Sequence, residues 1–269
     1  MSSTVDSNLF VSLTTIPSRL SSLWKTIDSL LAQTINPTRI VVNIPRQYTL
    51  RFLRQPVDEC LVQLLVDRYA SNPTVVIHRT DRDNGPGTKL IGFLVWKQSQ
   101  DPQSLVHDEN SFVVLVDDDV VYKPEFLSGF VPHLDSCMAA SYCVNSYPVK
   151  RADGTSYNFI AGQGRDGFVI QLPCLYAFIH YYNIFISSRA INLHDDFFTS
   201  FYLLLQKIPI KPIVFGGNGE LVYEAHTEID SLHDLPGEFS RDNIIKRSIS
   251  LLTCYFLDKT ITDEDIARS

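Results

Sequence analysis

The chain has 269 residues, of which 45% are hydrophobic and 20% charged, so it can form a substantial core and wholesale disorder is excluded. Its formal net charge is −7, from 23 basic and 30 acidic side chains, which argues against a nucleic-acid polymer as the main partner, because such proteins carry a basic surface. A small anionic ligand is compatible with this charge, since a metal ion and a few local cations are enough to bind it.

The sequence contains five cysteines, an odd number, and no Cys-x-x-Cys pair. This usage disfavours a disulfide framework and a zinc site, and it favours a reducing compartment. The N-terminal residues 1–10 carry neither the basic nor the apolar segment of a signal peptide. We therefore predict a cytoplasmic protein.

Residues 9–122 alternate between short apolar strands and amphipathic helices. Strands are predicted over 11–15, 40–44, 74–78 and 112–116. Helices are predicted over 20–31, 57–69 and 88–97. Ser18 is the expected N-cap of the first of these helices.

This alternation predicts a mostly parallel central sheet with helices on both faces, which is a three-layer α/β/α architecture. Right-handed crossovers place the carboxyl ends of parallel strands along one edge of such a sheet. The loops after Thr15, His78 and Val116 should therefore converge there. In open α/β sheets, that edge is where ligands bind.

The second half of the sequence is less regular. It predicts a strand over 139–144, hairpins or ligand-facing loops over 157–170, a helix over 195–206, a strand over 213–215 and a final helix over 244–256. No repeat, low-complexity tract or convincing linker interrupts the chain. We predict one domain over residues 1–269, with a nucleotide-binding half at about 9–122 and an acceptor half at about 123–269.

Residues 168–188 form an aromatic-rich segment without charged residues that is long enough to span a bilayer. Three polar residues and a proline lie near its middle, namely Gln171, Pro173, His180 and Asn183. This pattern favours a buried strand followed by a mostly buried helix, and it argues against a transmembrane span. Contact of the aromatic side chains with a membrane surface is an alternative that the pattern leaves open.

Three consecutive aspartates, Asp117, Asp118 and Asp119, follow an apolar run that has the composition of a fully buried strand. Carboxylates this close together repel one another, and they stay ionised only when a cation or several hydrogen-bond donors offset their charge. A hard divalent metal, Mg²⁺ or Mn²⁺, takes oxygen ligands and often bridges to substrate phosphates. The motif therefore predicts a metal site at the sheet edge, and a solvated acidic loop is the alternative.

A glycine-rich loop runs from Asp83 to Lys89, after the third predicted strand. Gly85 and Gly87 allow its backbone to approach a ligand, and Lys89 places a cation near a helix start, where anions bind. The loop differs from the Walker and dinucleotide-binding fingerprints, so it is either a phosphate or nucleotide contact or an ordinary turn. Arg19, just after the first strand, is either a phosphate partner or a solvated arginine.

Asp195 and Asp196 occupy the first turn of the predicted helix at 195–206, where the helix dipole favours negative charge. Two interpretations are open for this pair. Either one carboxylate serves as a general base, which typically contributes about 10²–10⁴-fold in rate, or both acids cap the helix. His226 and His233 are each candidates to add a ligand to a metal held mainly by Asp119, or are structural histidines.

Four segments carry a resemblance to a known family. They are VSLTTIPSRL at 11–20, DNGPGTKL at 83–90, LVDDDVVYKPEFL at 115–127 and HDDFFTSFYLL at 194–204. Together they resemble metal-dependent glycosyltransferases of the GT-A fold, and in particular the small glycosyltransferases encoded by large DNA viruses of algae. The triple aspartate and the Asp-Asp helix are fairly specific in combination, whereas either alone is weak.

The resemblance implies a nucleotide-diphosphate-sugar donor, by default a UDP-sugar, and a divalent cation, Mn²⁺ or Mg²⁺. It implies that Asp119 ligates the metal, that Asp117 contacts the ribose or the donor sugar, and that Asp118 does either. Asp196 matches the position of the base that deprotonates the acceptor hydroxyl. The family often has Glu where this chain has Asp195, which leaves the choice between the two acids open.

The resemblance also implies that the donor is held by the loop after the first strand and by the 83–89 loop. The residues concerned are Thr14, Thr15, Arg19, Asp83 and Gly85, with Lys89 facing phosphate or sugar. A carboxylate on the opposite face of the sugar from the leaving diphosphate activates the acceptor for in-line attack, which predicts inversion. If the protein is viral, its expected location is the host cytoplasm and its expected process is glycan synthesis on viral protein.

Two other functions fit parts of the pattern. Asp117-x-Asp119 after an apolar strand resembles the nucleophile motif of haloacid-dehalogenase-like, Mg²⁺-dependent phosphatases, although that motif usually lies on the first strand and here three strands precede it. A non-catalytic protein that binds a sugar or a nucleotide is the third alternative.

Overall fold

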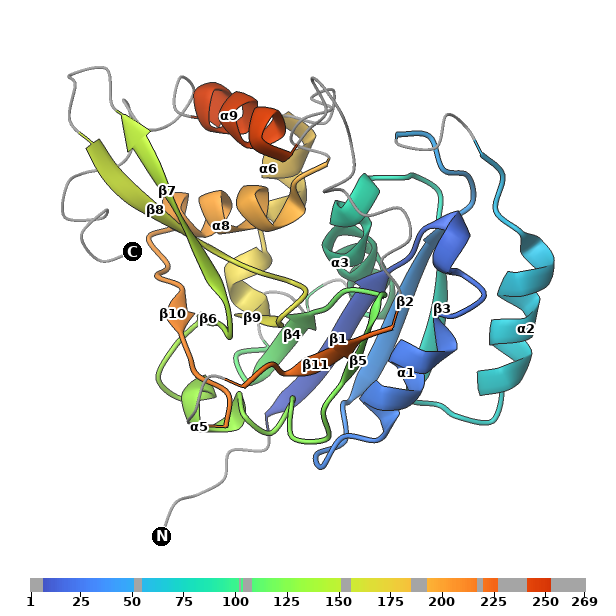
Figure 1. The fold of residues 1–269 in the computed structure, drawn as a ribbon. Coiled ribbons are helices and arrows are strands. Elements are labelled where there is room, and N and C mark those ends of the chain that lie inside the picture. The colour runs from blue at the N-terminus through green and yellow to red at the C-terminus, as the bar shows by residue number, and fades with distance from the viewer. Residues whose placement is uncertain are drawn as a thin grey trace, which may run out of the picture.

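The computed structural model describes residues 7–50, 55–101, 103, 108–150, 156–184, 193–216, 220–226 and 241–252. Within these residues the central sheet has seven strands in the order β10-β6-β9-β4-β1-β2-β3 (Figure 1). The strands are β1 (Asn8–Thr14), β2 (Arg39–Pro45), β3 (Val75–Thr80), β4 (Ser111–Leu115), β6 (Ala139–Ser141), β9 (Phe168–Gln171) and β10 (Lys211–Pro212).

The first four strands of this sheet are parallel to one another, as the alternating sequence pattern predicts. β1 pairs with β2 on one side and β4 on the other, and β3 pairs with β2. β9 is antiparallel to both of its neighbours, β4 and β6, whereas β10 is parallel to β6. The carboxyl ends of β1 to β4 therefore share one edge, and the predicted mixed α/β fold with a mostly parallel sheet is confirmed.

Helices cover both faces of the sheet. Successive side chains of a strand point to opposite faces, and both faces carry apolar side chains that the helices bury. Phe10 of β1 and Val113 of β4 belong to the core beneath α3 (Thr88–Gln100), α6 (Phe178–Ile184) and α8 (Asp195–Leu205). Val11 and Val114, one residue further along each strand, belong to the core beneath α1 (Trp24–Leu31), α2 (Glu59–Tyr69) and α5 (Val131–Leu134).

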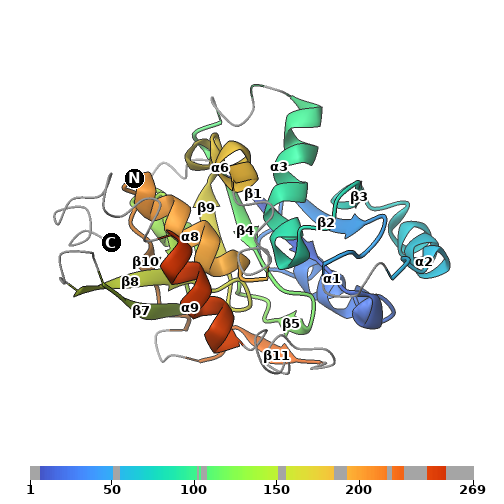
Figure 2. The ribbon, with the colours of Figure 1, turned by 90° about the horizontal axis from the view of Figure 1, so that it is seen from above.

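The second half of the chain adds two small sheets and a further helix. β7 (Val144–Lys150) and β8 (Ser156–Gly162) form an antiparallel hairpin, and β5 (Val120–Tyr122) pairs with β11 (Tyr223–Ala225). Figure 2 shows α9 (Arg241–Leu252) beside α8, which it contacts. Short 3₁₀ helices occur at η1 (Pro17–Arg19), η2 (Gly85–Gly87) and η3 (Leu172–Leu175).

Two local predictions are wrong. Ser18 does not cap a helix, because Pro17 and its neighbours close the 3₁₀ turn η1 and α1 begins only at Trp24, with no side-chain cap. The predicted strand at 213–215 lies beyond β10: Ile213 donates one backbone hydrogen bond to Ser141, and the chain then leaves the sheet. Both errors arise where a proline-containing segment precedes an apolar run.

The uncharged segment that begins at Phe168 folds as a buried strand, β9, followed by η3 and α6, as predicted for its described part. Residues 185–188 of the segment, and residues 253–256 of the predicted final helix, lie outside the described residues. No helix within the described part of the chain is long and apolar enough to cross a membrane.

Candidate active site

The three aspartates lie between β4 and β5, at the carboxyl edge of the parallel strands. Asp118 is buried and accepts hydrogen bonds from the Thr15 hydroxyl at 2.6 Å and from Nη1 of Arg19 at 2.8 Å. The same Arg19 nitrogen lies 3.2 Å from Oδ2 of Asp119. The 3₁₀ turn η1 positions this arginine, so the loop after β1 and the acidic loop converge as the parallel topology predicts.

One carboxylate oxygen of Asp119 has no partner in the part of the chain that the structure describes. Its Oδ1 is buried and accepts no hydrogen bond there, although Oδ2 pairs with Arg19. Burial raises the pKa of Asp119 to about 6, with the negative charge of Asp117 adding to the effect and Arg19 opposing it. A buried carboxylate oxygen of this kind is a ready ligand for a hard cation.

His226 reaches Asp119 through the pairing of β11 with β5. Its backbone amide donates to the carbonyl of Asp119 at 3.1 Å, and its Nε2 lies 3.1 Å from the hydroxyl of Thr26. That hydroxyl has one proton, which it donates to the carbonyl of Val120 at 2.7 Å or of Asp118 at 3.0 Å. When the hydroxyl donates to one of these carbonyls, the Thr26 oxygen accepts from Nε2–H, and Nδ1 of His226 is then the unprotonated nitrogen.

The residues at this edge suit a divalent cation in part. Nδ1 of His226, like Oδ1 of Asp119, is buried and has no hydrogen-bond partner among the described residues. Burial also lowers the pKa of His226, which favours the neutral imidazole that binds metals. Within the described residues, no three His, Cys, Asp or Glu side chains are grouped closely enough to hold a metal by themselves. The chain therefore offers two acceptor atoms and leaves room for ligands from elsewhere.

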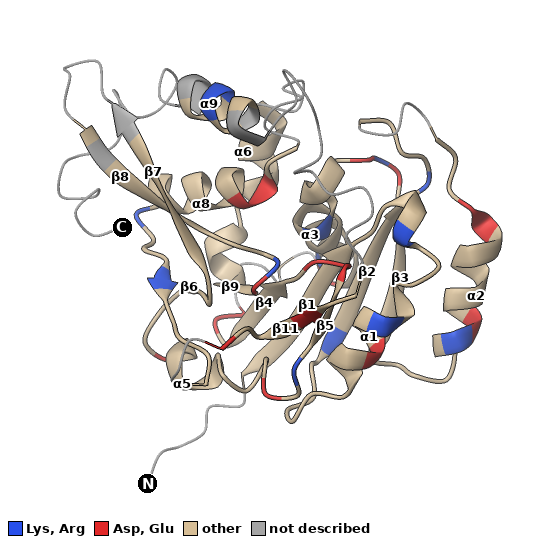
Figure 3. Ribbon diagram, in the orientation of Figure 1, with Lys and Arg blue, Asp and Glu red and all other residues tan. Residues whose placement is uncertain are grey.

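Lys89 lies among carboxylates. Its side chain is 3% exposed, and its Nζ lies 2.6 Å from Oδ1 of Asp117 and 3.2 Å from Oδ2 of Asp195. Asp117 follows β4, and Asp195 lies in the first turn of α8, whose acidic start is red in Figure 3. Lys89 therefore joins two acidic groups that are far apart in the sequence.

Asp196 is held by a backbone amide of the loop between β8 and β9. The amide of Gly164 donates to both of its carboxylate oxygens, each at 3.1 Å. Burial raises the pKa of Asp196 to about 8, with Asp195 adding to the effect and Lys89 opposing it. The side chain of His194, whose Nδ1 accepts from the amide of Phe197, caps α8 instead of either acid.

Two predicted donor-binding residues are engaged with backbone. Asp83 accepts from the amides of Thr49 at 2.7 Å, Leu50 at 3.0 Å and Gly85 at 2.8 Å, so it shapes its own loop. Gly85 has a φ of +58°, which glycine adopts without strain. The Thr14 hydroxyl donates to the carbonyl of Asn43 at 2.7 Å. The roles of these residues in nucleotide binding stay predictions.

Sequence reasoning missed three residues of the site. They are Gly164, Thr26 and Tyr122, whose hydroxyl accepts from the amide of Asp117 at 3.0 Å and donates to the carbonyl of Arg165 at 3.1 Å. The glycines at 162, 164 and 167 signalled a loop that approaches a ligand, but not which carboxylate it would meet. Thr26 and Tyr122 read as parts of a helix and a strand, so no local signal marks them.

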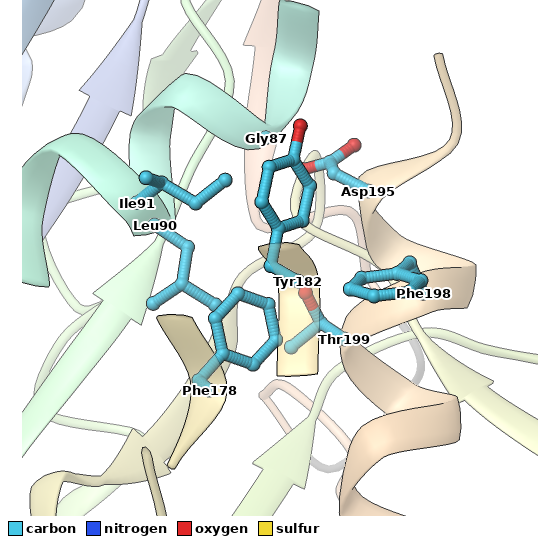
Figure 4. A pocket seen from close by; sticks show the side chains of 8 residues that line it. All are labelled: Gly87, Leu90, Ile91, Phe178, Tyr182, Asp195, Phe198 and Thr199. Carbon is cyan, nitrogen blue, oxygen red and sulfur yellow. The ribbon is translucent and has the colours of Figure 1, made fainter. Parts of the chain in front are cut away.

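A small apolar pocket lies beside Asp195, between α3, α6 and α8 (Figure 4). It is lined by Gly87, Leu90, Ile91, Phe178, Tyr182, Asp195, Phe198 and Thr199. Its volume of about 10 Å³ is enough for about one water molecule and far too small for a sugar ring. The pocket is therefore a gap where three helices meet.

No protein-family model and no curated protein matches the chain. Among solved structures, TarS from S. aureus in complex with UDP-GlcNAc matches with a TM-score of 0.50 and 14% identity, over 91% of this chain and 66% of that chain. The mannosyltransferase PcManGT from Pyrobaculum calidifontis, in complex with GDP-Man and Mn²⁺, matches with a TM-score of 0.49 and 13% identity, over 83% of this chain and 58% of that chain.

The likeness to TarS concerns the fold alone, which is the GT-A fold. The chain spans 58% to 66% of the length of the two solved structures, so the activities of those whole proteins do not transfer to it directly. The resemblance to the enzymes of algal viruses stays a prediction.

Proposed function

We propose that the protein is a glycosyltransferase that moves a hexose or pentose from a UDP-sugar to a hydroxyl of a glycan acceptor. One observation carries the proposal: the acids that follow β4 and the acids that begin α8 meet at one site, on either side of Lys89. The first group suits the diphosphate side of a donor, and the second suits the acceptor side. The fold, shared with nucleotide-sugar enzymes, supports the same assignment.

On the donor side, Asp119 and His226 would hold Mn²⁺ or Mg²⁺ through the two buried acceptor atoms that lack partners. The bound ion would supply positive charge to the diphosphate as the sugar leaves, and diphosphate oxygens would complete its ligands. Arg19 fixes Asp118 and Asp119 in orientation and offsets part of their charge. Thr15 adds a second donor to Asp118.

On the acceptor side, Asp196 is the better base of the two adjacent acids. The carboxylate of Asp195 lies 3.2 Å from the Lys89 ammonium and is engaged in that ion pair. Asp196 has a pKa raised to about 8, close to the value that suits a general base at neutral pH. A base across the sugar from the diphosphate favours in-line attack and inversion.

A panel of nucleotide sugars tests the proposal. Thermal unfolding is measured with UDP- and GDP-sugars, with and without Mn²⁺ or Mg²⁺, and nucleotide release is then followed for the donor that stabilises the protein most. We expect metal-dependent stabilisation by one UDP-sugar and slow release of UDP, accelerated by glycan acceptors. Asp196→Asn should abolish turnover and retain donor binding, whereas Asp81→Asn, at a side chain that is 95% exposed, should change neither.

Two outcomes would replace the proposal, and a third would correct one part of it. Turnover of an aryl phosphate without any use of nucleotide sugars would indicate a phosphatase. Donor binding by the unmodified protein without turnover, across donors and acceptors, would indicate a binding protein. Retention of the anomeric configuration, measured by NMR on the product, would contradict inversion alone.

The remaining expectations are part of the same proposal. We place the enzyme in the cytoplasm, in that of the host if the chain is viral, and we expect no nucleic-acid partner. Contact with a membrane surface would involve aromatic side chains in α6 and just before it. Tyr176, before the helix, is exposed, whereas Tyr181 and Tyr182 of the helix are buried.

A further inference from the structure

We infer that Lys89 is a positioning residue, whose ammonium ties the donor edge of the sheet to the acceptor helix α8 and so sets the distance between donor and base. The inference rests on the proposed function. Lys89 was expected to face phosphate or sugar, but its Nζ lies 2.6 Å from Asp117 and 3.2 Å from Asp195. A side chain that is 3% exposed and paired with two carboxylates has little freedom to bind a third anion.

The backbone of Lys89 is fixed as firmly as its side chain. Its carbonyl accepts from the Ser12 hydroxyl at 2.5 Å and from Nδ2 of Asn43 at 3.3 Å, which ties the start of α3 to β1 and β2. Both strands belong to the rigid parallel part of the sheet. The ammonium is therefore a fixed point of the donor half, and α8 is attached to it through Asp195.

The loop that holds Asp196 packs against the same ammonium. A Cβ at Gly164 would lie 2.8 Å from Nζ of Lys89 and 3.1 Å from Oδ1 of Asp196, so only glycine lets the loop approach this closely. A second contact lies nearby, where a Cβ at Gly87 would lie 3.7 Å from Cβ of Asp195. The donor acid, the ammonium, α8 and the Gly164 loop thus form one packed unit.

A tether of this kind controls rate rather than donor affinity. Displacement of a catalytic group by about 1 Å can cost about 10²-fold in rate, because the reacting atoms leave their attack geometry. If Lys89 held the phosphate instead, its loss would weaken nucleotide binding, because the charge of the diphosphate would be left without its partner. Loss of a positioning residue therefore lowers kcat, whereas loss of a phosphate-binding residue weakens donor binding.

The test is Lys89→Met, with UDP in MnCl₂ as the binding probe and release of UDP from the best UDP-sugar as the measure of turnover. We expect kcat to fall by about 10²-fold while the Kd for UDP changes by less than about threefold. Lys97→Met on the same helix, whose ammonium pairs with Asp108 at 3.3 Å, is the matched control and should leave both values unchanged. A rise of tenfold or more in the Kd for UDP, with kcat retained, would overturn the inference.

Asp195→Asn covers the case in which Lys89→Met does not fold, because it leaves the Lys89–Asp117 pair intact. We expect kcat to fall while the Kd for UDP is nearly unchanged, as for Lys89→Met. We also expect the double variant to be no slower than the slower single variant, since both substitutions remove the same contact, between Lys89 and Asp195. Multiplicative losses would show that Asp195 acts on its own, and would also overturn the inference.

The pH profile gives a readout that a merely structural residue would not move. Asp196 is faced by Asp195, Lys89, Asp117 and the amide of Gly164, and of these only the ammonium and the amide lower its pKa. Lys89→Met should therefore shift the rising limb of kcat to higher pH, whereas Lys97→Met should not. If the rising limb of kcat in Lys89→Met does not shift, the inference is contradicted. If the unmodified protein neither binds UDP nor turns over a UDP-sugar, the proposed function is refuted, and the inference with it.

Discussion

The amide of Gly164 donates to both carboxylate oxygens of Asp196, each at 3.1 Å, although the two residues are 32 positions apart in the sequence. The loop between β8 and β9 makes this contact through its backbone, and a side chain added at Gly164 would meet both Lys89 and Asp196. The orientation of the proposed base is therefore set by a residue that has no side chain.

Gly164→Ala should reduce turnover by about 10²-fold, because either the Lys89 ammonium or the loop that holds Asp196 must shift to make room for the methyl group. Gly87→Ala is the structural comparison, since its Cβ would meet its neighbours at 3.7 Å, an ordinary contact distance. Thermal unfolding and UDP release measured on both variants check this. Full activity of Gly164→Ala would mean that its amide does not orient the base.

The activity should rise with pH, because Asp196, with its pKa raised to about 8, must lose its proton to serve as a base. We expect kcat/KM for the free enzyme to increase about tenfold per pH unit below that value and to level off above it. Rates at fixed metal and saturating acceptor, measured between about pH 6 and pH 9, check this. A flat profile would assign the proton transfer to another group.

The stability should fall as pH rises, because burial of Asp196 raises its pKa from 3.8 to about 8. The folded protein keeps this proton over a range in which the unfolded chain has released it. The contribution to the free energy of unfolding is thus complete below about pH 4 and is lost as the pH rises through about 8. Urea unfolding of the unmodified protein and of Asp196→Asn should diverge over this range, with the asparagine variant less sensitive to pH.

Arg19→Met should destabilise the fold by about 3–5 kcal/mol, because it leaves Asp118 and Asp119 buried without their shared cation. Arg46→Met is the matched control. Its guanidinium pairs with Asp81 at 3.1 Å, but the two side chains are 63% and 95% exposed, so we expect a change below about 1 kcal/mol. Similar urea midpoints for the two variants would contradict the assignment of Arg19 as the ion that holds the acidic loop.

His226→Ala should weaken Mn²⁺ binding in the presence of UDP by at least about tenfold, because it removes the unpartnered nitrogen at the acid edge. Thr26→Val should weaken binding less, since it keeps the histidine and removes the hydroxyl that contacts Nε2 of His226 and the carbonyls of Asp118 and Val120. Calorimetric titration with MnCl₂ distinguishes the two. Unchanged Mn²⁺ affinity in both variants would remove His226 from the metal site.

The parallel half of the fold could be predicted from the sequence, because its strands and helices alternate with clear periods. The convergence of the loop after β1 with the acidic loop followed from that topology, although the pairing of Arg19 with Asp118 did not. The partners of Lys89 could not be predicted, since Asp195 lies more than a hundred residues away and nothing local shows that α8 returns to the start of α3. Residues of the irregular half, such as Gly164, are placed by long-range packing, which one sequence does not reveal.

The pairing of β11 with β5 has a consequence for how such a protein can be rebuilt. His226 arrives beside Asp119 only because Tyr223–Ala225 lies antiparallel to Val120–Tyr122. The proposed cation site is thus shared between early and late stretches of the polypeptide. A hybrid that kept this nucleotide half and took a foreign acceptor half would lose the histidine unless the graft carried its own strand for that edge.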